Sequence, residues 1–266
     1  MSVSPELNIS EIDTDRFLSV SHISKRYFRN SSLTEALRDV CLSLNKGEIV
    51  SIVGFSGCGK STLLRILAGL ISPSQGKIWI EEKTPIEYRK AGNIGFVFQK
   101  PVLFDWRTVQ ENMLLPAEIA RFSKGLAEER ALKLLSMVGL GGVEKSYPSQ
   151  LSGGMRQRVA FARSLMIQPK LLLLDEPFSA LDEITRENLW VDFHQIWRQQ
   201  ELSVVLVTHS IREAVFFADR VLVMSPRPGQ VQGEIKVSLP FLRNQSVTVC
   251  SEFIELCEQV RNRLSP

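Results

Sequence analysis

The sequence predicts an α/β fold in which a largely parallel sheet presents a nucleotide site at the carboxyl ends of its strands. Residues 48–53 have the pattern of a short buried strand, residues 54–62 that of a glycine-rich phosphate-binding loop, and residues 63–68 that of a helix. A second buried strand at 171–176 ends on two carboxylates, as strands do that deliver acids to a sheet edge. Between these strands, residues from about 100 to 168 carry apolar positions at helical spacing, which predicts an inserted helical subdomain.

The phosphate-binding loop matches the pattern GxxxxGK[ST] at every fixed position. It consists of Gly54, Phe55, Ser56, Gly57, Cys58, Gly59, Lys60, Ser61 and Thr62. Its glycines allow backbone turns that a Cβ would forbid, so the loop amides and the following helix N-terminus can form a cradle for anions. We expect Lys60 to reach the β- and γ-phosphates, Ser61 to bind Mg²⁺ and Thr62 to lie near the α-phosphate. A chance glycine-rich turn is the alternative, and the strand–loop–helix context argues against it.

The composition indicates an ordinary globular protein of one large or two small domains. Of 266 residues, 44% are hydrophobic and 23% are charged, and the net charge is +3. No apolar run approaches the roughly 20 residues of a transmembrane helix. So small a positive charge gives little support to nucleic-acid binding. We expect residues 1–15 to be a flexible leader, since they are polar and acidic and do not resemble a signal peptide.

The cysteines show no CxxC spacing, so the sequence predicts neither a disulfide nor a metal site from them. They are Cys41, Cys58, Cys250 and Cys257. Cys58 differs from the others, because the loop amides and Lys60 would favour a reactive thiolate at its position. The alternative is that Cys58 is a small residue that fills the loop.

The N-terminal segment is predicted to form two paired antiparallel strands. Residues 17–24 and 35–44 have roughly alternating apolar positions, and residues 29–32 between them have the composition of a hairpin loop. This segment also presents two aromatic rings. Either Tyr27 or Phe28 could stack on a nucleotide base, and packing at a strand end is the alternative.

Beyond the phosphate loop, the sheet is expected to resume and then to give way to helices. The strands are expected at 77–81 and 93–98, and Gln99 follows the second one. Helices separated by glycine or proline are expected at 109–120, 126–138 and 156–167.

Polar residues follow two buried strands of the second half, at the predicted sheet edge that carries the phosphate loop. Asp175 would hold Mg²⁺, and Glu176 would orient and activate the attacking water. A helix at 183–200 precedes a strand at 204–208, which ends on His209, a candidate γ-phosphate sensor. Each of these groups alone is more often solvated or structural, so the functional interpretation rests on their convergence.

The C-terminal part is expected to close the fold. Strands at 220–224 and 231–237 precede an amphipathic helix at 246–264, so residues 241–266 are predicted to be a helical tail packed on the core. The remaining histidines, His22 and His194, have no neighbouring motif that indicates a role.

Taken in order, these motifs resemble the ATP-binding subunits of ABC transporters. The most specific one is Leu-Ser-Gly-Gly-Met at 151–155, and the others are the phosphate loop, Gln99, the acidic strand end, Ser-Ala-Leu-Asp at 179–182 and His209. The resemblance covers about residues 16–237, and we place the ATP-binding domain at 16–240. It implies a P-loop NTPase (RecA-like) core with an N-terminal antiparallel β subdomain and the inserted helical subdomain.

The resemblance implies a head-to-tail dimer with ATP between the two subunits. In physical terms, Ser152 and the amides of Gly153 and Gly154 open a helix and form a second anion site. In the dimer, this second site would face the phosphate loop of the partner. The remaining roles implied are base stacking for Tyr27, Mg²⁺ and water binding for Gln99, general base for Glu176, a contact across the dimer for Asp182 and a switch role for His209. Phe55 stands where relatives usually have proline, without touching the phosphate contacts.

Two segments, 99–109 and 224–229, look like the importer group that takes up nitrate, sulfonates and taurine. The implied partners are a second ATP-binding subunit, transmembrane permease subunits and, indirectly, an extracytoplasmic solute-binding protein, with no nucleic acid. The implied location is the cytoplasmic face of the cell membrane. The solute stays open, because such subunits do not contact it.

A cluster of Phe104, Trp106 and Arg107 is predicted to receive a short helix of the membrane subunit. Burial of Trp106 in the helical subdomain is the alternative. The competing function is a soluble ABC ATPase acting on ribosomes or DNA, which normally has two ATP modules or a long coiled-coil insertion. This chain has one module and no heptad run. Intact Glu176 and His209 argue against a regulator that binds ATP without turnover.

Overall fold

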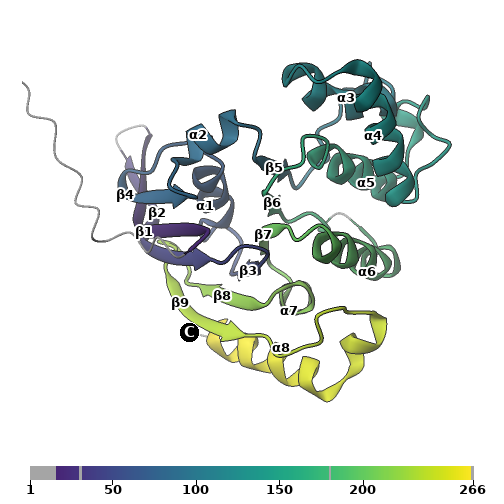
Figure 1. Ribbon diagram of the computed structural model, residues 1–266. Coiled ribbons are helices and arrows are strands. Elements are labelled where there is room, and N and C mark those ends of the chain that lie inside the picture. The colour runs from purple at the N-terminus through teal and green to yellow at the C-terminus, as the bar shows by residue number, and fades with distance from the viewer. Residues whose placement is uncertain (1–15, 30–31, 180, 265–266) are drawn as a thin grey trace, which may run out of the picture.

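Two sheets, the helices that pack beside them and a separate lobe of helices make up the described part of the molecule (Figure 1). The computed structural model describes residues 16–29, 32–179 and 181–264, so the leader expected at 1–15 lies outside the described residues. One sheet has three antiparallel strands in the order β2-β1-β4, and the other has six strands in the order β5-β6-β7-β3-β8-β9. None of the described helices is long and apolar enough to cross a membrane.

The three-stranded sheet consists of β1 (Leu18–Arg29), β2 (Ser32–Leu44) and β4 (Gln75–Ile80), and β1 pairs antiparallel with both neighbours. The predicted pairing of the first two strands is therefore confirmed. We expected the strand at 77–81 to continue the sheet that follows the phosphate loop. It joins this antiparallel sheet instead. Its burial explains the difference, because only alternate positions at its end are buried, as in a strand with one solvated face.

The six-stranded sheet forms the centre of the molecule. Its strands are β3 (Ile49–Val53), β5 (Ile94–Val97), β6 (Leu171–Asp175), β7 (Ser203–Thr208), β8 (Arg220–Met224) and β9 (Val231–Lys236). Neighbouring strands are parallel except β8 and β9. Every residue of β3, β6 and β7 is buried, which explains their continuous apolar sequences. Because β3, β6 and β7 are parallel neighbours, their carboxyl ends lie at the same edge of the sheet.

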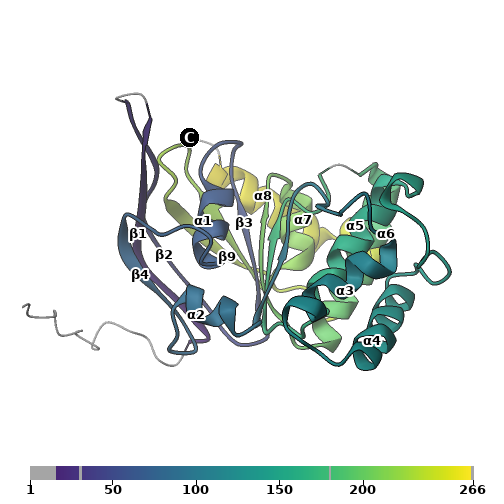
Figure 2. The same cartoon turned by 90° about the horizontal axis from the view of Figure 1, so that it is seen from above.

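Helices cover both faces of this sheet. Helix α1 (Lys60–Leu67) packs between the two sheets, whereas α7 (Ile211–Phe217) and α8 (Ser251–Leu264) lie on the other side (Figure 2). The helix predicted at 246–264 begins as a short 3₁₀ turn, η3 (Gln245–Val249), and continues as α8. Helix α2 (Pro85–Lys90), opened by a capping box at Thr84, was not predicted.

The helical lobe lies to one side of the sheet in both views (Figures 1 and 2). It contains α3 (Val109–Ile119), α4 (Lys124–Met137) and α5 (Gly153–Ser164), which pack on one another. In sequence these helices lie between β5 and β6, which nevertheless pair directly. The predicted helices are present within a few residues of their expected bounds, as is α6 (Glu183–Gln199) beside the central sheet.

Candidate functional site

The phosphate-binding loop connects β3 to α1 and needs its glycines for two different reasons. Gly57 and Gly59 have φ of 78° and 115°, values that residues with a Cβ rarely adopt. A Cβ on Gly59 would also lie 2.7 Å from the carbonyl oxygen of Ala36. Gly54 is needed for space, because a Cβ there would lie 2.9 Å from the sulfur of Cys58. Cys58 itself is buried, which fits its interpretation as a residue that fills the loop.

Lys60 lies inside the curve of this loop. Its side chain is 4% exposed, and its Nζ donates to the carbonyl oxygens of Gly54 and Phe55 at 2.8 and 3.1 Å. The ammonium is also 3.9 Å from Oε1 of Glu176. A positive charge is thus held at the floor of an anion cradle, next to the carboxylate at the strand end.

The oxygen donors expected for a metal ion lie together. Ser61 Oγ donates to Oδ1 of Asp175 at 2.7 Å, and burial raises the pKa of that carboxyl. Asp175 is 4% exposed at the end of β6, so its carboxyl group is shielded from bulk solvent, whereas Ser61 lines the cavity described below. A hydroxyl and a carboxylate are hard donors, so this pair fits Mg²⁺. Gln99 lines the same cavity as Ser61 and adds an amide oxygen.

Two polar side chains at neighbouring strand ends, those of Gln99 and His209, contact the carboxylate of Glu176. Its Oε2 accepts from Nε2 of Gln99 at 3.1 Å and is 3.1 Å from Nδ1 of His209. Gln99 follows β5, Glu176 follows β6 and His209 follows β7, as the parallel sheet requires. Glu176 has φ of 45°, and its backbone N–H donates to Val207 at 2.9 Å. The backbone hydrogen bond holds the carboxylate at the sheet edge despite an unfavourable conformation.

Lys60, Ser61, Gln99 and Glu176 line one cavity of about 370 Å³ above the loop, whereas Asp175 and His209 do not line it. It is lined by Tyr27, Thr34, Ala36, Ser56, Gly57, Gly59, Lys60, Ser61, Thr62, Gln99, Glu176 and Arg227. Tyr27 is 40% exposed at its edge, which leaves one ring available to a base, whereas Phe28 is not among the lining residues. Phe55 is half exposed and borders a neighbouring cavity with His209.

Arg227 also lines the cavity, although no motif of the sequence indicates it as a site residue. Its guanidinium donates twice to the carbonyl oxygen of Gly57, at 3.2 and 3.0 Å. It comes from the loop between β8 and β9, which the backbone of Gly229 joins to Ala36. The sequence alone could not predict this contact, because it depends on the pairing of β8 with β3.

The Ser-Gly-Gly element is not brought to this cavity. Ser152 caps α5, and its Oγ accepts from the backbone N–H of Met155 at 3.2 Å. Ser152, Gly153 and Asp182 are exposed, and none of them lines the cavity of the phosphate loop. Ala180, within the 179–182 segment, lies outside the described residues. The chain thus carries a nucleotide-sized cavity and, apart from it, a helix N-terminus that is open to a ligand.

A phosphate loop, an oxygen pair for Mg²⁺ and a carboxylate oriented by an amide and an imidazole define a nucleotide-hydrolysing α/β protein. The family model of ABC transporters matches residues 37–179, so the chain belongs to the ABC transporter family. Membership makes it an ATPase, with ATP and Mg²⁺ as cofactors. The resemblance seen in the sequence is therefore confirmed.

Similar proteins agree with this assignment over most of the chain. The aliphatic sulfonates import ATP-binding protein SsuB of Bacillus anthracis is 39% identical, over 86% of this chain and 89% of the relative. The bicarbonate transport ATP-binding protein CmpD of Synechocystis is 40% identical, over 90% and 84%. Among solved structures, the ATP-binding cassette MJ0796, a dimer in a post-hydrolysis state with ADP and phosphate, is 34% identical with a TM-score of 0.75. The match covers 84% of this chain and all of that one.

Proposed function

We propose that this chain is the ATP-hydrolysing subunit of an importer for a small anion of the nitrate, sulfonate or taurine type. It would work at the cytoplasmic face of the cell membrane. The observation that carries the proposal is the convergence of Gln99 and His209 on Glu176, beside Lys60 and the phosphate loop. This arrangement is suited to turnover, because a site that only bound nucleotide would not need an oriented base.

The residues in and next to the cavity could bind MgATP as follows. The loop amides and Lys60 would hold the phosphates, and Tyr27 would stack on the base. Ser61, Asp175 and Gln99 would hold Mg²⁺, which neutralises charge on the phosphates when bound.

Glu176 would accept the proton of the attacking water. Gln99 and His209 contact the same oxygen, Oε2, so they fix the plane of the carboxylate. Lys60 faces the other oxygen and stabilises its negative charge. The chain's own residues therefore orient a base that is 14% exposed and partly shielded from water.

We further propose that two subunits pair head to tail around ATP. Ser152 and Gly153 are exposed at a helix N-terminus and contribute nothing to the cavity of their own chain. A helix N-terminus favours an anion, and the γ-phosphate in a partner's loop would supply it. Asp182, also exposed, would contact the partner. That the related cassette MJ0796 was solved as a dimer supports this arrangement.

The coupling surface to a membrane subunit is proposed at the segment after β5. Trp106 is 74% exposed, which argues against its burial in the helical lobe, and its ring lies 4.8 Å from that of Phe104. Val102 beside them is 53% exposed. Such an apolar patch suits a docked helix of a permease subunit. Gln99 lies three residues before Val102, so the patch is directly linked to the nucleotide site.

The kind of solute is inferred from the relatives. SsuB is named for sulfonates and CmpD for bicarbonate, both of them small anions. The solute itself would be bound by other proteins, namely a solute-binding protein and the permease, and not by this chain.

Copurification from detergent-solubilised membranes tests the proposal. A tagged chain should bring down a polytopic membrane protein, and Trp106→Ala should weaken that association. A matched control is Leu126→Ala, which removes another exposed apolar side chain on α4. Recovery with ribosomes or DNA and without a membrane protein would instead support the soluble ATPase.

A further inference from the structure

Two irregular places in the antiparallel sheet turn His22 and Asp39 to its outer face, where Cys41 also lies. His22 on β1 and Asp39 on β2 have φ of 54° and 50°, and the β1–β2 register shifts on both sides of Ile23. The irregularities let Ile23 and Val40 stay buried while their neighbours His22 and Asp39 are exposed. Cys41, the second residue after Asp39, is exposed as well.

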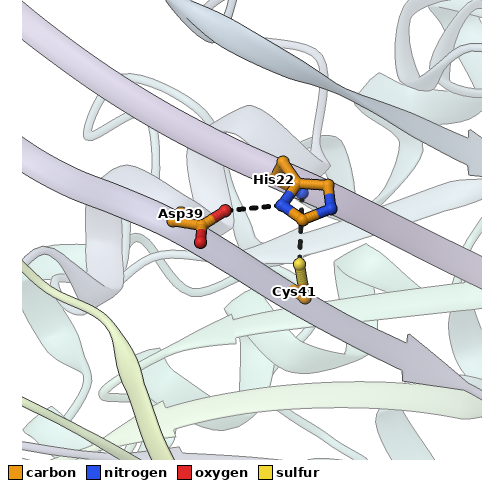
Figure 3. Close-up of side chains that lie close together, drawn as sticks. All are labelled: His22, Asp39 and Cys41. Atoms are coloured by element: carbon orange, nitrogen blue, oxygen red, sulfur yellow. Dashed lines mark hydrogen bonds and ion pairs between the residues drawn. The ribbon is translucent and has the colours of Figure 1, made fainter.

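The three side chains gather at one point, as Figure 3 shows. His22 Nδ1 lies 2.6 Å from Oδ1 of Asp39, and the sulfur of Cys41 accepts from the backbone N–H of His22 at 3.2 Å. The potential ligand atoms all lie within 4.8 Å of one another. A tetrahedral ion with bonds of about 2.0–2.3 Å sets its ligands roughly 3.3–3.7 Å apart. Small rotations of these exposed side chains would reach that spacing.

We propose that His22, Asp39 and Cys41 form a binding site for a divalent transition-metal ion, Zn²⁺ in the first place. Imidazole, carboxylate and thiolate are the three donor types that Zn²⁺ uses in proteins, and the exposed setting leaves a fourth position to water. Mg²⁺ does not suit a thiolate and an imidazole. Binding would displace the thiol proton of Cys41, so affinity falls as the solution becomes acidic.

This site is separate from the nucleotide site. None of its three residues lines the cavity above the phosphate loop. Within the described residues, no other group of three His, Cys, Asp or Glu side chains comes as close together. The spacing in sequence gives no hint of it, because His22 and Cys41 are 19 positions apart and meet only through strand pairing.

Cobalt is a suitable probe, since Co²⁺ takes the place of Zn²⁺ and is coloured. The full chain, free of nucleotide and reduced, is titrated with Co²⁺ while the near-ultraviolet thiolate-to-metal band and the visible bands are recorded. We expect saturation at one equivalent, with a tetrahedral spectrum that Zn²⁺ abolishes. Cys41→Ser should remove the thiolate band. His22→Asn and Asp39→Asn should each weaken Co²⁺ binding by more than about tenfold, since even the loss of a group that hydrogen-bonds to a metal ligand costs that much. Asn tolerates the left-handed backbone at both positions.

The control is Cys250→Ser, which removes a half-buried thiol far along the sequence and should leave the spectrum unchanged. Basal ATPase activity should be unaltered in all four variants, which shows that they fold. The proposal is overturned if the thiolate band survives Cys41→Ser, if Cys250→Ser removes it, or if Co²⁺ gives only the weak visible bands of oxygen coordination.

Discussion

Replacing Glu176 by glutamine tests the proposed base with the smallest change of shape. The amide keeps an acceptor oxygen, which can turn toward Gln99 and His209, the two groups that contact Oε2. Its NH₂ group then faces the ammonium of Lys60, where Oε1 now lies at 3.9 Å. ATP binding should therefore change little, because the phosphate cradle is unaltered.

Hydrolysis should fall much further, since the amide cannot accept a proton from water. Loss of a general base costs about 10²–10⁴-fold in rate. Phosphate release at saturating MgATP measures the rate, and a fluorescent ATP analogue measures binding. The matched control is Glu128→Gln on α4, whose carboxylate lies 4.0 Å from the ammonium of Lys124. If Glu176→Gln retained a third or more of the wild-type rate, Glu176 would not be the base.

Three further predictions concern other parts of the chain. Lys60→Ala should lose nucleotide binding itself, because it removes the charge at the floor of the cradle; unchanged ATP affinity would contradict this. Trp106→Ala should spare basal ATPase but reduce solute-stimulated ATPase in the assembled transporter; an equal loss of both would show that Trp106 supports the ATPase itself and not the coupling. Burial raises the pKa of Glu213 to about 8 from its ordinary 4.5. The contribution of this group to the free energy of unfolding is therefore fully present below the pKa of the unfolded state. It is lost as the pH rises toward the pKa of the folded state. The free energy of unfolding of Glu213→Gln relative to the wild type should therefore rise between about pH 5 and pH 8, by up to about 1.4 kcal/mol per pH unit, and thermal unfolding should show this as a growing difference in Tm. A Tm difference that stays constant with pH would exclude the ionisation of Glu213 as the cause.

The candidate site could be predicted largely from the sequence, because parallel strands bring their carboxyl ends to one edge. Gln99, Glu176 and His209 each follow such a strand, so their convergence needed only the strands to be recognised. The phosphate loop could also be predicted from the sequence, because its glycines are required by the backbone conformation and by the lack of space for a Cβ.

Features that depend on pairing between distant segments could not be predicted. Arg227 reaches Gly57 only because β8 lies beside β3, and β4 joins the antiparallel sheet although it follows α1. Helix α7 was missed for a local reason. Its buried residues 213–217 are consecutive, so the helix is covered on most sides and shows no 3.6-residue period.

If ATP joins two copies of the chain head to tail, as proposed, the molar mass of the Glu176→Gln protein should depend on nucleotide. Light scattering should give a monomer without nucleotide and a dimer with MgATP, because ATP supplies much of the interface and is not consumed. Adding Ser152→Arg should abolish the dimer, since the new side chain would extend from the cap of α5, where the γ-phosphate of the partner is proposed to dock. A dimer that forms without ATP and survives Ser152→Arg would contradict the head-to-tail arrangement.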